Sequence, residues 1–136
     1  MISFKYQKEK SDLGEVWRPV AQVTLLVKNF RVEIPLYIDS GADITLIPLG
    51  FGEALGFKQD SAQIKEIRGV SGGTVPYIIK NVKLLIGDVK FSVRIAWSLS
   101  EEVPPLLGRL DVFTKFKIVF DEENKIVEFH PKSIKK

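Results

Sequence analysis

Tyr37-Ile38-Asp39-Ser40-Gly41-Ala42-Asp43 is the stretch that decides both the fold and the candidate chemistry. An apolar strand ends here in a carboxylate, and a hydroxyl and a glycine follow at once. Burying a lone carboxylate is costly unless the group is protonated or paired. Ser40 offers a hydroxyl to a neighbouring loop, and Gly41 allows a tight backbone turn. The stretch therefore predicts an acid held in place at the end of a strand and facing solvent.

The triplet Asp39-Ser40-Gly41 has a second interpretation, because Asp, Ser and Gly are also the residues that an ordinary turn after a strand prefers. Two further elements bear on the choice. A glycine-rich stretch, Gly69 to Thr74, follows about thirty residues later. Two apolar residues, a glycine and an arginine, Leu106 to Arg109, come near the end of the chain. An ordinary turn predicts neither of these elements.

In this order and spacing, the three elements resemble the signature of the retroviral-type (retropepsin-like) aspartic peptidases, in their single-lobe homodimeric form. That signature is an apolar pair, then Asp-Thr/Ser-Gly-Ala, a glycine-rich flap, and an apolar-apolar-Gly element. The resemblance spans roughly residues 20–129. It implies an all-β fold, with a closed or barrel-like acid protease lobe and one or two short helices.

The resemblance also implies the chemistry of an aspartic endopeptidase. Asp39 would pair with Asp39 of a second copy and activate a water that hydrolyses a peptide bond, with no cofactor. Asp12-Leu13-Gly14 is similar to the triplet but follows Lys10-Ser11, so no apolar strand delivers its carboxylate. With one such acid per chain, a symmetric homodimer acting on a peptide or protein is the expected assembly.

The resemblance assigns supporting roles to other residues. Ser40 would hydrogen-bond across the two-fold axis, and Asp43 would form an ion pair with Arg109 that braces the loop. Two exposed charges of little energetic value are the alternative for that pair. The active-site support residues are Ser40, Gly41, Ala42, Asp43, Gly108 and Arg109.

A flap that closes over bound peptide is the expected role of the glycine-rich stretch. An ordinary hairpin turn remains the alternative. Tyr77 and Trp97 are candidates for pocket lining or for the core. The flap and substrate-binding residues would be Gly69, Val70, Ser71, Gly72 and Gly73.

Segments rich in Val, Ile, Phe and Tyr, punctuated by Gly, Asn and Asp, predict mostly strands. A strand is expected over residues 16–28, with a turn at Asn29-Phe30 and a returning strand over 32–38. Hairpins are expected over 64–80, 82–97 and 116–129. Short helices are expected over 49–55, closed by Gly56, and from Asp111 through Phe116.

The 136 residues, 45% of them hydrophobic, suit one domain over 1–136, with a core at about 16–130 and a basic tail over 131–136. The absence of cysteine excludes disulfides and thiolate catalysis. Met1 to Asp12 lacks the apolar run of a signal peptide, and no stretch is long and apolar enough to span a bilayer. We therefore expect a soluble, cytoplasmic protein without a membrane partner.

Other functions fit the sequence less well. The net charge of +3 is compatible with a nucleic-acid-binding protein. The aromatic residues do not interleave with Lys and Arg along one face, however, which argues against that function. A Ser40 nucleophile would have only His130 as its base, outside any Gly-x-Ser-x-Gly context. A non-catalytic peptide-binding or dimerisation module on the same fold stays open. No metal site is expected, because the spacing matches no known loop for the candidate ligands Asp39, Asp43, Asp60 and Asp88.

Overall fold

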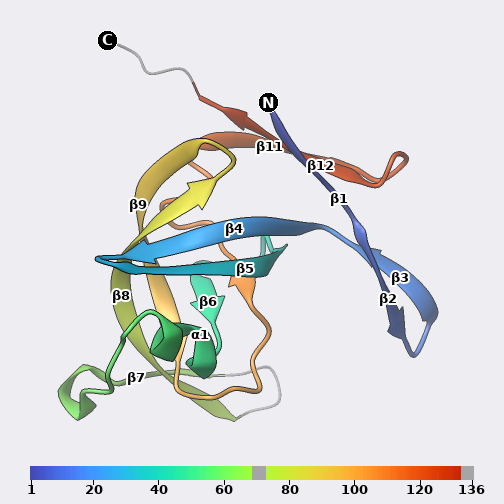
Figure 1. Cartoon of the computed structure of the whole chain (residues 1–136). Coiled ribbons are helices and arrows are strands. Elements are labelled where there is room, and N and C mark those ends of the chain that lie inside the picture. Colours follow the sequence, from blue (N-terminus) through green and yellow to red (C-terminus); the bar gives the residue numbers. More distant parts are fainter. Residues whose placement is uncertain (69–72, 133–136) are drawn as a thin grey trace.

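The computed structural model describes residues 1–68 and 73–132 (Figure 1). Its elements in chain order are β1 (Ile2–Lys5), β2 (Gln7–Ser11), β3 (Gly14–Arg18), β4 (Val20–Val27), β5 (Phe30–Ile38), β6 (Thr45–Ile47), α1 (Leu49–Ala54), the 3-10 turn η1 (Ser61–Gln63), β7 (Lys65–Arg68), β8 (Thr74–Ile86), β9 (Val89–Ser98), β10 (Leu106–Leu107), β11 (Phe116–Asp121) and β12 (Ile126–Pro131).

Six strands close into a barrel in the order β4, β5, β10, β6, β9, β8. The ring closes because β8 pairs with β4 as well as with β9, and β7 extends it at the outer edge of β8. A separate sheet, β1-β12-β11, and the two-stranded hairpin β2-β3 lie outside the barrel (Figure 1). The predicted all-β, barrel-like lobe is confirmed.

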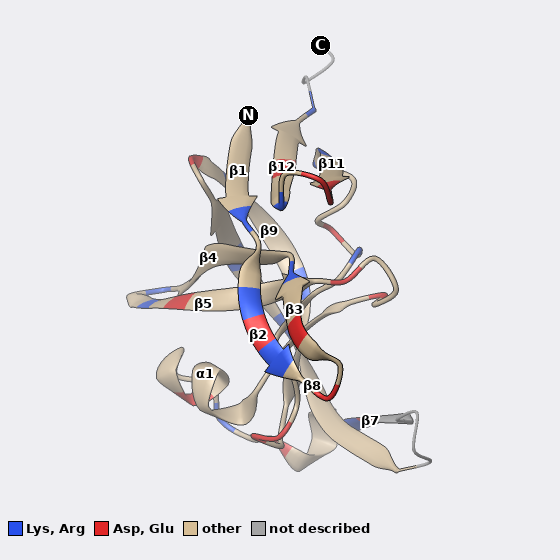
Figure 2. Cartoon of the chain, turned by 90° about the vertical axis from the view of Figure 1, so that its right-hand side faces the viewer, with Lys and Arg blue, Asp and Glu red and all other residues tan. Residues whose placement is uncertain are grey.

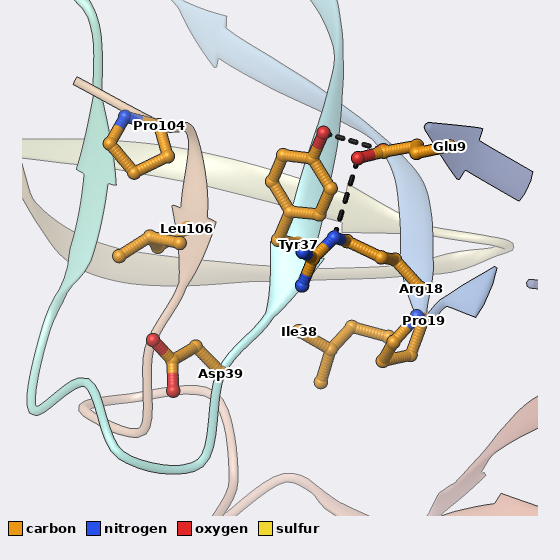
Figure 3. A pocket seen from close by; sticks show the side chains of 8 residues that line it. All are labelled: Glu9, Arg18, Pro19, Tyr37, Ile38, Asp39, Pro104 and Leu106. Atoms are coloured by element: carbon orange, nitrogen blue, oxygen red, sulfur yellow. Dashed lines mark hydrogen bonds and ion pairs between the residues drawn. The ribbon is translucent and has the colours of Figure 1, made fainter. Parts of the chain in front are cut away.

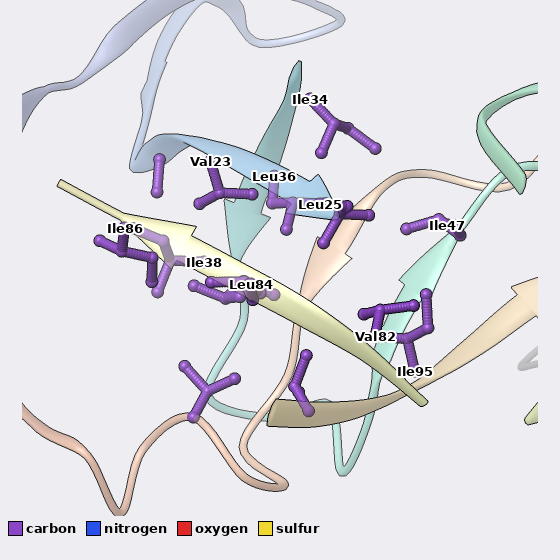
Figure 4. Close-up of a cluster of buried hydrophobic side chains, with 14 of the residues drawn as sticks. Val23, Leu25, Ile34, Leu36, Ile38, Ile47, Val82, Leu84, Ile86 and Ile95 are labelled. Atoms are coloured by element: carbon purple, nitrogen blue, oxygen red, sulfur yellow. The ribbon is translucent and has the colours of Figure 1, made fainter. Parts of the chain in front are cut away.

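The barrel interior is filled by alternate residues of its strands. Along β5, Ile34, Leu36 and Ile38 are buried, and Val82 and Ile86 of β8 face them (Figure 4). This spacing follows from the pleat, which sends successive side chains to opposite faces. Burying each such side chain stabilises the fold by roughly 1.5–3 kcal/mol. The core therefore fixes where β5 ends, and with it the position of the motif that follows.

Two expected local structures differ in detail. The strand predicted over residues 16–28 is divided at Pro19, which has no N–H to donate and separates β3 from β4. The turn predicted at Asn29-Phe30 lies one residue earlier, because Val27 pairs with Phe30 and Lys28 adopts a left-handed φ of 53°. The β5 strand is correspondingly longer than predicted.

Of the two predicted helices, one is present. The α1 helix ends before Gly56, whose φ of 81° suits a left-handed helix end, as predicted. The helix predicted from Asp111 is wrong. Asp111 itself has a left-handed φ of 65°, which a helix N-cap does not adopt, and its carboxylate accepts hydrogen bonds from the Arg94 backbone and guanidinium.

No helix in the described part of the chain is long and apolar enough to cross a bilayer.

Strands begin at Ile2, before the core expected at residues 16–130. Tyr6, between β1 and β2, is buried and anchors this segment to the β11-β12 turn. Its N–H donates to the Lys125 carbonyl at 2.8 Å, and its hydroxyl donates to a Glu122 carboxylate oxygen at 2.8 Å. Burial, with this hydrogen bond, raises the pKa of Tyr6 to about 12.

Alkaline unfolding tests the Tyr6 anchor. The unfolded chain releases this proton near pH 10, whereas the folded chain keeps it to about 12. The free energy of unfolding should therefore fall across this interval, and Tyr6→Phe should remove that part of the slope. Urea denaturation at stepped pH measures both proteins. Equal slopes would contradict the anchor.

Gly52 in α1 lies against the indole of buried Trp97, whose Nε1 donates to the Leu49 carbonyl at 3.0 Å. A Cβ on Gly52 would overlap that indole. Gly52→Ala should therefore lower the free energy of unfolding by about 1–3 kcal/mol and alter the Trp97 near-UV circular dichroism. Gly50→Ala is the matched control in the same helix, because its Cβ would meet only the flexible Glu101 carboxylate. Equal stability of the two variants would refute this packing.

Candidate active site

Asp39 lies immediately after β5, at the point where β10 runs parallel to that strand. Its N–H donates to the Leu107 carbonyl at 3.0 Å, so the backbone at Asp39 is tied to β10. One carboxylate oxygen, Oδ1, accepts the N–H of Gly41 at 2.9 Å. The residue is half-buried and borders an open depression (Figure 3). The carboxylate is thus held in place while solvent can reach it.

The loop from Asp39 to Asp43 is fixed by backbone hydrogen bonds. The Ala42 N–H donates to the Asp39 carbonyl at 3.1 Å. The Ala42 carbonyl accepts the Arg109 N–H at 3.0 Å, and the Asp43 carbonyl accepts the Leu110 N–H at 2.9 Å. Two distant segments of the sequence motif are therefore joined as one structural unit.

Gly108 permits this close approach. A Cβ at that position would overlap the backbone of Ile44. Its N–H donates to the hydroxyl of buried Thr45 at 3.1 Å. Gly41 lies in a tight turn, as predicted, which the Ala42 N–H closes on the Asp39 carbonyl; its φ is not in the left-handed region, and a Cβ there would lie 3.2 Å from Asp39 Oδ1. The backbone of Ile44 therefore requires glycine at position 108, whereas at position 41 a side chain would crowd the Asp39 carboxylate.

Arg109 and Asp43 form an ion pair between the guanidinium and Oδ1. Their side chains are 55% and 87% exposed in the single chain. Exposed pairs contribute at most about 1 kcal/mol. In the single chain, the backbone hydrogen bonds made by Asp39, Ala42 and Asp43 therefore hold the loop more strongly than this ion pair does. Ser40, next to Asp39, is also exposed.

The depression beside Asp39 has a volume of about 560 Å³ (Figure 3). Its walls combine apolar side chains with a polar corner, where the Tyr37 hydroxyl donates to Glu9 at 2.6 Å and Arg18 Nε lies 3.4 Å from the same carboxylate. The hydrogen bond to Glu9 is the largest cause that raises the pKa of Tyr37, and burial acts in the same direction. The lining residues are Glu9, Arg18, Pro19, Tyr37, Ile38, Asp39, Pro104 and Leu106.

The sequence interpretation did not identify the polar corner. Tyr37 carried a usable signal, since residues two apart on a strand share a face and Tyr37 is two residues before Asp39. Glu9 and Arg18 carried none. They reach the site only because the β2-β3 hairpin folds back beside β5, which no local pattern encodes.

A second depression, of about 430 Å³, shares Leu106 with the first. Tyr77 of β8 lines it, so this tyrosine lies at a surface pocket, whereas Trp97 belongs to the core. The lining residues are Ala42, Asp43, Ile44, Leu46, Tyr77 and Leu106.

The predicted flap lies mostly outside the described residues, which omit Gly69, Val70, Ser71 and Gly72. The arms that lead to it are described, and β7 pairs with β8 up to Arg68 opposite Thr74. Gly73 is exposed, with no atom within 4 Å of where a Cβ would lie.

Comparison with solved structures shows which known fold this chain resembles. No protein-family model matches the sequence, and no curated protein matches it significantly. Among solved structures, a retropepsin-like aspartic protease from Rickettsia conorii aligns with a TM-score of 0.60 and 18% identity, covering 93% of this chain and 98% of that one. EIAV protease, in complex with the inhibitor HBY-793, aligns with a TM-score of 0.55 and 22% identity, covering 71% and 86%. The chain therefore has a retropepsin-like fold.

The Gly108 contact is testable. Gly108→Ala should lower the free energy of unfolding by about 2 kcal/mol or more, because neither Ile44 nor Gly108 can move without breaking the bonds of the Asp39 loop. Gly73→Ala, with open space around its Cβ, should change it by less than about 0.5 kcal/mol. Urea denaturation measures both, and a Gly108→Ala protein as stable as the control would contradict the contact.

Proposed function

We propose that this protein is an aspartic endopeptidase that acts as a homodimer, with Asp39 of each copy forming the catalytic pair. The observation that carries the proposal is the placement of Asp39. Its backbone is tied to β10 and its Oδ1 to Gly41, yet its carboxylate borders an open depression of about 560 Å³. The retropepsin-like fold, shared with aspartic proteases, supports the same function.

A second copy supplies the acid that a single chain lacks. Two carboxylates in contact cannot both ionise easily, so one proton is shared between them. The ionised Asp39 takes a proton from a bound water as the water oxygen attacks the scissile carbonyl carbon. The protonated Asp39 gives its proton to the carbonyl oxygen. When the tetrahedral intermediate collapses, the carbon–nitrogen bond breaks, the Asp39 that took the water proton gives it to the leaving amine nitrogen, and the other Asp39 recovers a proton from a hydroxyl of the intermediate as the carboxyl product forms.

The two depressions suit an extended peptide. They adjoin through Leu106, and both border the loop that carries Asp39. An extended chain presents alternate side chains to pockets of this kind, while its backbone bonds to a neighbouring strand. The second depression, lined by residues such as Leu46 and Tyr77, is largely apolar, which favours an apolar substrate side chain there; the depression beside Asp39 has a mixed lining.

Exchange of the proposed catalytic group is the direct test. Asp39→Asn keeps the shape of the side chain and removes its ability to carry the proton. Cleavage of unfolded protein substrates, measured from acidic to neutral pH, should fall by about 10²–10⁴-fold or to background. Asp88→Asn, in the exposed β8-β9 turn, is the matched control and should cleave normally.

The outcomes separate the functions. Cleavage that survives Asp39→Asn would overturn the proposed chemistry. If the native protein binds peptides but cleaves none at any pH, the fold serves as a peptide-binding module instead. Sedimentation of both variants checks that the dimer is retained.

A further inference from the structure

The hairpin of β2 and β3, residues 7–18, lies outside the barrel as a separate two-stranded ribbon, with Glu9 reaching back to Tyr37 (Figures 1 and 2). Within the described residues, β2 and β3 pair only with each other. A two-stranded ribbon is marginally stable by itself in water. This one is nevertheless held at both ends. Tyr6 anchors its start to the β11-β12 turn, and the Pro19 carbonyl accepts the Ile38 N–H at 3.0 Å just after it ends.

The two faces of the hairpin differ. On the inner face, Glu9 turns toward the barrel and accepts the Tyr37 hydroxyl. On the outer face, Trp17 is 45% exposed with the Lys8 ammonium 5.3 Å from its ring centroid. At the tip, Leu13 is 91% exposed. The hairpin therefore presents two large apolar side chains to solvent on a ribbon whose direction is fixed.

The charges of the hairpin argue against a strongly charged partner. Residues 7–18 contain three basic and three acidic side chains, and these alternate in Figure 2. Such a surface has no single-sign field to attract nucleic acid or an anionic membrane. It is compatible with a neutral, symmetric contact between identical chains.

We propose that the β2-β3 hairpin docks on a second copy of this chain and buries Leu13 and Trp17 in the contact. The inference rests on the proposed function, because it takes the pairing of two Asp39 residues as given. Glu9 and Arg18 of the hairpin border the same depression as Asp39. A copy that brings its own Asp39 to this place must therefore approach the hairpin.

Surface area supports the same conclusion. A stable dimer buries about 800 Å² on each partner. The loop from Asp39 to Asp43 spans only five residues and is too small to provide this by itself. The hairpin extends the contact surface from the edge of the site, and each copy contributes the same ribbon, as a two-fold interface requires.

Leu13→Asp tests the contact at the tip. In the protomer Leu13 is almost fully exposed, so the thermal stability of the monomer should not change. The dimer dissociation constant, measured by sedimentation, should rise about tenfold or more, because the substitution places a charge in an apolar contact. Asn29→Asp adds the same charge in the exposed β4-β5 turn and should leave the dissociation constant unchanged.

Tryptophan fluorescence gives a second readout on the unmodified hairpin. The chain has two tryptophans, and Trp97 is already buried in the protomer. As concentration rises and dimers form, acrylamide quenching of Trp17 should decrease, and Trp17→Phe should abolish that change. Trp17 protection that appears only when peptide is added would assign the hairpin to substrate and overturn the proposal.

Failure of this inference is distinguishable from failure of the proposed function. If the protein dimerises and cleaves, but Leu13→Asp dimerises equally well and Trp17 stays open to quencher, the hairpin proposal is wrong while the catalytic proposal stands. If the native chain is monomeric at every concentration and cleaves nothing, both are wrong.

Discussion

The approach of β10 to the Asp39 loop is the constraint on which the rest of the site depends. Gly108 lacks a side chain, so its backbone can lie against Ile44, and the segment after it bonds to Ala42 and Asp43. These contacts join residues some sixty positions apart in the chain. They leave the Asp39 carboxylate free to face the depression while the backbone around it is fixed. Exposed ion pairing by Arg109 adds little to a unit that backbone hydrogen bonds already hold.

The barrel supplies the rigidity behind this loop. Alternate apolar residues of β5 fill the interior and end at Ile38, so Asp39 is the first residue beyond the core. Because a strand alternates its faces, a shift of one residue would reverse every side chain of β5. The register that buries Ile34, Leu36 and Ile38 is therefore the register that presents Asp39. Stability of the fold and placement of the acid have the same physical origin.

The single chain leaves several groups exposed beside this acid. Ser40, Asp43 and the ribbon that carries Trp17 all face solvent near the Asp39 loop. A single carboxylate has no neighbour with which to share a proton, and a two-stranded ribbon has little to stabilise it alone. The dimer proposed above would account for both features, because a second copy would complete the site and cover the ribbon.

The sequence by itself determined the strand that ends at Asp39, the α1 helix closed by Gly56, the hairpins and the all-β class, because alternation and glycine act over a few residues. It also indicated that Asp39, Gly108 and Arg109 belong together, although only by resemblance. Tertiary structure alone decided that Glu9 and Arg18 reach the depression. It also decided that the Asp111 carboxylate accepts hydrogen bonds from Arg94 instead of capping a helix. Those contacts join segments distant in the chain, and their geometry depends on how the whole barrel closes.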